Sequence, residues 1–137
     1  MTEVLFHASC VAIEDEDSVS LVGFADREIG TTHYFILERA HEFDTQDRDL
    51  GMDTYYIERD DQSFSCYGGI VSYAQHPDRI RFELDDKASR KLGVGRTLQI
   101  TFDIDRARSA DLAKKLALIL AENACESPGA SGVSEPD

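Results

Sequence analysis

The chain has 137 residues and a mass of 15.3 kDa, a size typical of one domain. Its 27 acidic and 14 basic residues give a net charge of −13, which argues against nucleic acid or an anionic membrane as a direct partner. No apolar run approaches the ~20 residues that a membrane span needs, so no membrane segment is predicted.

The first half of the chain alternates β-type runs with polar turns. Residues 1–13 lack the basic start and the small-residue cleavage site of a signal peptide, and the β-type run at 4–13 is predicted as a first strand. Residues 40–52 carry many charges and no alternation, so we expect an ordered loop there that could include one helical turn. The strands of this half are expected at 4–13, 19–24, 33–37, 53–58, 62–67 and 70–74.

The second half carries the clearest signals. Polar and apolar residues alternate without exception at 79–84 and 97–104, which predicts strands with one wet face. A short helix is predicted over 86–92, and a longer one over 109–123 with one apolar face and Asp105 or Ser109 as its N-cap. The predicted architecture over residues 1–125 is therefore α+β: a mostly antiparallel sheet of about six to eight strands with the C-terminal helix packed on one face. Residues 126–137 have the composition of a disordered acidic tail.

Charge is most concentrated between Glu38 and Asp61, where nine acids and three bases give a net charge of −6 in 24 residues. Tyrosines there would supply rigid contact area, while carboxylates would steer a basic partner. This predicts a protein-binding surface; the alternative is a solvated acidic loop with its tyrosines half in the core. The predicted contact residues are Glu42, Asp44, Asp47, Asp49, Asp53, Tyr55, Tyr56 and Tyr67.

Four of these carboxylates leave a second function open. Asp44, Asp47, Asp49 and Asp53 lie within ten residues and are oxygen ligands that suit calcium or magnesium, as in a small metal-dependent enzyme or a metal-binding protein. However, the EF-hand spacing and the histidine spacings of zinc sites are absent, and no nucleophile motif or phosphate-binding loop occurs. We therefore expect no catalysis, no metal and no cofactor.

The densest segment also contains a recognisable pattern. The run LERAHEFDTQDRDLGMDTYYIE from Leu37 to Glu58, followed by SCYGGI from Ser65 to Ile70, resembles the signature of the tenth numbered family of bacterial polymorphic-toxin immunity proteins. The pattern is FD-x-QD-x-x-LGMD-x-YY-x-E and then CYGGI, and a looser likeness extends over residues 3–122.

The resemblance implies a binding protein that blocks a cognate toxin domain and has no catalytic activity. It carries over no contact residue, so the motif could equally be structural. The acidic charge leads us to expect a basic toxin domain, with a nuclease as the expected type. We expect reduced cysteines and a cytoplasmic location, and exposed sheet edges would allow a homodimer through strand pairing.

Overall fold

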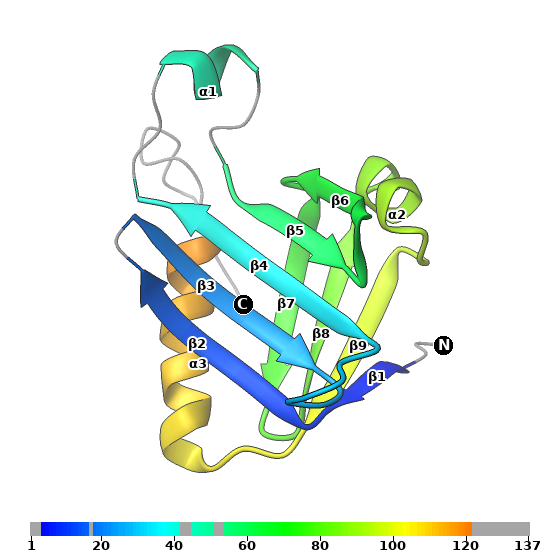
Figure 1. Cartoon of the computed structure of the whole chain (residues 1–137), viewed down its shortest axis with the longest axis vertical. Helices are drawn as coiled ribbons and strands as arrows, with labels where there is room; N and C mark the ends of the chain where they lie inside the picture. The colour runs from blue at the N-terminus through cyan, green and yellow to red at the C-terminus, as the bar shows by residue number, and fades with distance from the viewer. Residues whose placement is uncertain (1–3, 17, 42–44, 51–53, 122–137) are drawn as a thin grey trace.

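The computed structural model describes residues 4–16, 18–41, 45–50 and 54–121, with residues 47 and 48 described by their backbone only. Within these ranges the chain forms nine strands and three helices (Figure 1). The strands are β1 (Val4–Ala8), β2 (Cys10–Glu16), β3 (Val19–Ala25), β4 (Tyr34–Ala40), β5 (Tyr56–Arg59), β6 (Asp61–Tyr67), β7 (Ile70–His76), β8 (Arg79–Leu84) and β9 (Thr97–Phe102). The helices are α1 (Thr45–Asp49), α2 (Asp86–Leu92) and α3 (Arg106–Ile119).

The strands divide into two sheets. One has the order β1-β9-β8-β7, and the other has the order β2-β3-β4-β5-β6. All neighbouring strands are antiparallel except β1 and β9, so the predicted α+β class with mostly antiparallel strands is confirmed. The strand predicted over residues 4–13 is interrupted at Ser9, which places β1 in the four-stranded sheet and β2 in the five-stranded one.

Aromatic side chains join the two sheets face to face. The ring centroids of Phe24 and Phe102 lie 5.9 Å apart, and those of Phe35 and Phe82 lie 5.4 Å apart. All four side chains are buried, and burial of such a side chain contributes about 1.5–3 kcal/mol. These contacts place the core between the sheets.

Helix α3 covers the rest of the same face of the five-stranded sheet. Its apolar stripe is buried at Leu112, Leu116 and Ile119, as the sequence predicts, and the helix packs against β2, β3 and β4. It begins three residues before the predicted start because Asp105 is the N-cap, accepting from Arg108 N at 2.8 Å. Figure 1 shows α3 and the four-stranded sheet together behind the five-stranded sheet.

Helix α2 follows its local sequence signals. It spans the predicted residues 86–92, with Asp85 accepting from Ala88 N at its start and Gly93 in the left-handed region at its end. No helix in the described ranges is long and apolar enough to cross a membrane. The predicted acidic tail, residues 126–137, lies outside the described residues.

Candidate functional site

Strand alternation gives the five-stranded sheet two faces, and only one of them is packed against α3 and the second sheet. We call the opposite one the outer face. No described helix or strand crosses it, and it faces the viewer in Figure 1. The strand register assigns to it Cys10, Ala12, Glu14 and Glu16 of β2, Val19, Leu21, Gly23 and Ala25 of β3, Tyr34, Ile36, Glu38 and Ala40 of β4, Tyr56 and Glu58 of β5, and Ser65 and Tyr67 of β6.

Three tyrosines and one glutamate form a cluster on this face. Tyr34 Oη donates to Glu58 Oε2 at 2.5 Å, and Tyr56 Oη donates to Glu58 Oε1 at 2.7 Å. The ring of Tyr56 lies 5.2 Å from that of Tyr67, with the planes inclined at 59°. Burial, reinforced by the Glu58 carboxylate, raises the pKa of Tyr34, so its phenol stays protonated as a donor. One carboxylate thus holds two of the three rings in a fixed arrangement.

The outer face is also strongly acidic. Its strand residues include four glutamates, Glu14, Glu16, Glu38 and Glu58, and no lysine or arginine. None of the four forms an ion pair within the described residues. Burial raises the pKa of Glu38, and the nearby Glu58 and Glu16 carboxylates raise it further. Among the described residues the negative charge of this face is therefore uncompensated, and a cation would stabilise it.

The family follows from a comparison with known proteins. Residues 7–110 match the family model described as Immunity protein 10. The chain belongs to this family. The matched segment runs from β1 into α3 and contains the whole outer face, and it confirms the resemblance read from residues 37–58 and 65–70. No curated protein matches the chain.

The predicted contact residues of this immunity-family protein differ in their exposure. Tyr56 and Tyr67 lie on the outer face, and Asp49 is exposed at the end of α1. Tyr55, in contrast, is 8% exposed; its hydroxyl accepts from Ile70 N at 2.8 Å and donates to Ile70 O at 3.3 Å. A side chain so buried offers no surface to a partner, so Tyr55 is not part of the binding surface proposed below. The remaining positions, Glu42, Asp44, Asp53 and the side chain of Asp47, lie outside what the structure describes.

Tyr34, Glu38 and Glu58 were not among the contacts predicted from the sequence. Charge density is highest in the connection between β4 and β5, so it favoured residues of that connection. The signal that could have found these residues is the period of two, because Tyr34 and Glu38 share one side of β4 and Tyr56 and Glu58 share one side of β5.

The described residues give no support to the metal-dependent alternative. They contain no group of three or more His, Cys, Asp or Glu side chains that could hold a metal ion. Of the four predicted ligands, only Asp49 has a described side chain. Cys66 is 7% exposed, and burial raises the pKa of its thiol, as for a small core residue.

One serine–histidine pair resembles a catalytic arrangement but cannot act as one. Ser20 Oγ lies 3.0 Å from His41 Nε2 and donates to Asp15 Oδ1 at 2.7 Å. Ser20 has no exposed surface, so no substrate can reach it. Lys115 of α3 pairs with the same Asp15 at 2.5 Å, so the group attaches α3 to the sheet.

Proposed function

We propose that this protein neutralises its cognate toxin by binding it with the outer face, and that the toxin surface it meets is basic. The observation that carries the proposal is the pairing, on one open sheet face, of tyrosines held by Glu58 with glutamates that have no cationic partner among the described residues. The protein acts by occlusion, without catalysis of its own, in the cytoplasm.

The tyrosines supply contact area that contributes to the binding affinity of this surface. Tyrosine is enriched at energetically important interface positions because it offers a large, rigid area with few rotatable bonds. Tyr34 and Tyr56 are already held in place, so binding does not bear the cost of ordering them. Ile36, two residues from Tyr34 on β4, and Leu21 on β3 add apolar area to the same face.

The glutamates supply steering. Complementary charge raises association rates by about 10–10³-fold, which matters for an inhibitor that must intercept its toxin. A basic domain, such as a nuclease that binds nucleic-acid phosphates, fits this face by charge. A partner cation near Glu38 would also relieve the repulsion among Glu16, Glu38 and Glu58.

The test uses the cognate toxin domain, expressed in an inactive form. Association and dissociation rates are measured at low and at high salt for the wild-type chain and for a Glu38→Gln/Tyr56→Ala variant. We expect the wild-type association rate to fall at least about tenfold at high salt. The variant should bind about 100-fold more weakly, with a smaller salt dependence.

The matched control is Glu83→Gln, which removes the same charge from β8 on the other sheet. It should bind like the wild type. If the outer-face variant binds as tightly as this control, the outer face is not the toxin-binding surface. If the variant binds more weakly but the wild-type association rate does not change with salt, the electrostatic part of the proposal is wrong, and only the contact role of the outer face remains.

A further inference from the structure

The loop between β3 and β4, residues 26–33, carries the most exposed large apolar side chain in the described part of the chain. Ile29 is 88% exposed, whereas Leu118 on α3 is 48% exposed. In a flexible loop, such a side chain could fold back against the protein and lose its exposure. Ile29 therefore stays exposed only if the loop is held in place.

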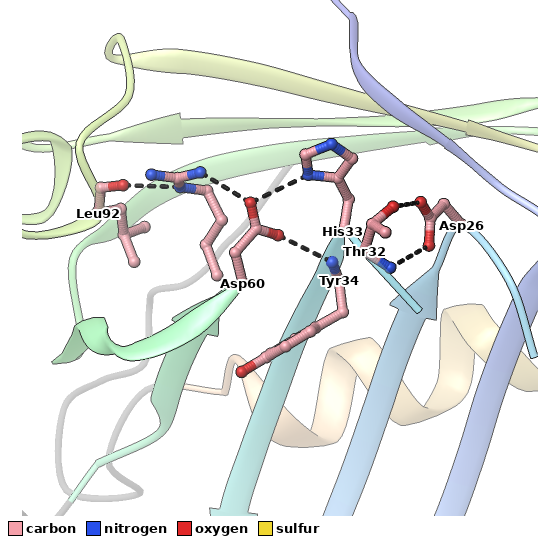
Figure 2. Close-up of polar contacts among 7 residues, drawn as sticks. Asp26, Thr32, His33, Tyr34, Asp60 and Leu92 are labelled. Atoms are coloured by element: carbon pink, nitrogen blue, oxygen red, sulfur yellow. Dashed lines mark hydrogen bonds and ion pairs between the residues drawn. The ribbon is translucent and has the colours of Figure 1, made fainter. Parts of the chain in front are cut away.

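Hydrogen bonds within the loop hold its two ends together. Asp26 accepts from Thr32 N at 3.1 Å and from the Thr32 hydroxyl (Figure 2). In addition, Asp26 N donates to His33 O at 3.0 Å. Thr31 Oγ1 donates to Arg27 O at 2.7 Å. The bonds from Thr32 lower the pKa of Asp26 to about 2, so the carboxylate that closes the loop is ionised at neutral pH.

A second set of bonds attaches the loop to the body of the protein. Figure 2 shows Asp60 beside His33 and Tyr34, at the point where the loop enters β4. Asp60 Oδ1 accepts from Tyr34 N at 2.9 Å, and its Oδ2 lies 3.1 Å from His33 Nδ1. Arg59 donates to Asp60 at 3.0 Å and to Leu92 O of α2 at 2.7 Å. The loop is therefore fixed to the turn between β5 and β6 and, through it, to α2.

The loop also lies at the rim of the outer face. It joins Ala25 to Tyr34, and both residues belong to that face. A typical interface buries about 800 Å² on each partner, and binding residues are often found on loops that a rigid scaffold holds in place. Loop 26–33 is held by hydrogen bonds and borders the outer face, so it can contribute to such an interface.

We propose that loop 26–33 is a second contact element of the toxin-binding surface and that Ile29 inserts into an apolar pocket on the toxin. The inference rests on the proposed function. Because the loop is fixed before binding, Ile29 is presented without an ordering cost. A pre-formed apolar anchor beside an acidic face slows dissociation, while the charges of the outer face set the rate of association.

The test compares Ile29→Ala with Leu118→Ala, which removes the same three carbons from an exposed position on α3. Binding to the inactive toxin domain is measured for both, with thermal melts to show that folding is intact. Ile29→Ala should weaken binding about 10–100-fold through faster dissociation, with unchanged salt dependence, whereas Leu118→Ala should bind like the wild type. Asp26→Ala, which keeps Ile29 but releases the loop, should also weaken binding.

The outcomes separate this inference from the proposed function. If Ile29→Ala binds within twofold of the wild type while the outer-face variant is impaired, the loop inference is wrong and the outer-face proposal stands. If Ile29→Ala impairs binding and the outer-face variant does not, the outer-face proposal fails, and the loop is then a contact by itself and not a second element of that surface. Equal losses for Ile29→Ala and Leu118→Ala would also overturn the inference, because the effect would then be non-specific.

Discussion

Replacing Gly69 with alanine tests whether the CYGGI part of the family signature is required for folding. Gly69 lies between β6 and β7 with φ of +103°, a conformation that L residues rarely adopt. A Cβ added there would lie 2.5 Å from Cβ of Ala88, which is fully buried in α2. The alanine variant therefore meets both backbone strain and a steric clash.

The size of the effect follows from these two terms. An L residue at positive φ costs about 1–3 kcal/mol. Overpacking against a buried helix residue costs about 1–3 kcal/mol more, because Ala88 is a short side chain that cannot rotate away. The sum of about 2–6 kcal/mol is a large part of the 5–15 kcal/mol that typically stabilises a domain. At about 4 °C per kcal/mol, the melting temperature should fall by roughly 8–24 °C.

Two other glycines separate the terms in the same thermal or urea unfolding assay. Gly30 has φ of +72° and nothing within 4 Å of an added Cβ, so Gly30→Ala should show the strain alone, about 1–2 kcal/mol. Gly95 has neither feature, so Gly95→Ala should be neutral or stabilising by about 0.4–1 kcal/mol. Equal destabilisation by Gly69→Ala and Gly30→Ala would refute the clash argument.

Three further predictions concern single side chains. Glu38→Gln should stabilise the fold at pH 7 and weaken toxin binding, because the pKa of Glu38 is raised in the folded state. The stability gain should disappear as the pH falls and the wild-type carboxyl protonates, and a gain that persists in acid would contradict this. Tyr55→Phe should cost about 1–3 kcal/mol in urea unfolding by leaving Ile70 N without its acceptor, at unchanged toxin affinity; reduced affinity in the folded variant would show a contact role. The carboxyl of Asp26 should titrate near pH 2 by NMR, because the bonds from Thr32 favour the ionised form; Thr32→Val should move this pKa up towards 3.8, and an ordinary value in the wild type would show that the loop bonds are absent in solution.

Elements with strong local signals were predictable to the residue. The strand at 79–84 has uninterrupted alternation, and the helix at 86–92 ends at a glycine suited to the left-handed region. The break at Ser9 was not predictable in the same way. The buried residues of β1 are the even-numbered Phe6 and Ala8, whereas Val11 of β2 is odd-numbered. Cys10 and Ala12 are also small and apolar, so the sequence does not show this change. The partner of β1 is also distant, because it pairs with β9 near the end of the chain.

The candidate site was predictable only in part, for a related reason. Alternation shows that Tyr34 and Ile36 are on one side of the strand and Phe35 and Leu37 on the other, but each pair contains one aromatic and one aliphatic residue. Which pair is covered depends on where α3 and the four-stranded sheet pack, and those contacts come from distant parts of the chain. Charge density pointed to β4 and β5, which carry part of the candidate site, but it was highest in the loop between them.

The position of Glu58 bears on whether the signature serves folding or binding. Successive residues of β5 alternate, so Ile57 packs in the core while Tyr56 and Glu58 face outward, and the same motif can serve both purposes. The core does not need the Glu58 bonds, because hydrogen bonds on a partly exposed face add only about 1 kcal/mol to stability. Placing an acid near Glu38 also introduces like-charge repulsion. What Glu58 does accomplish is to fix two tyrosine rings at the surface, and a fixed ring gains affinity when a partner covers it. A partner with positive charge of its own, as proposed above, would remove this cost in charge repulsion.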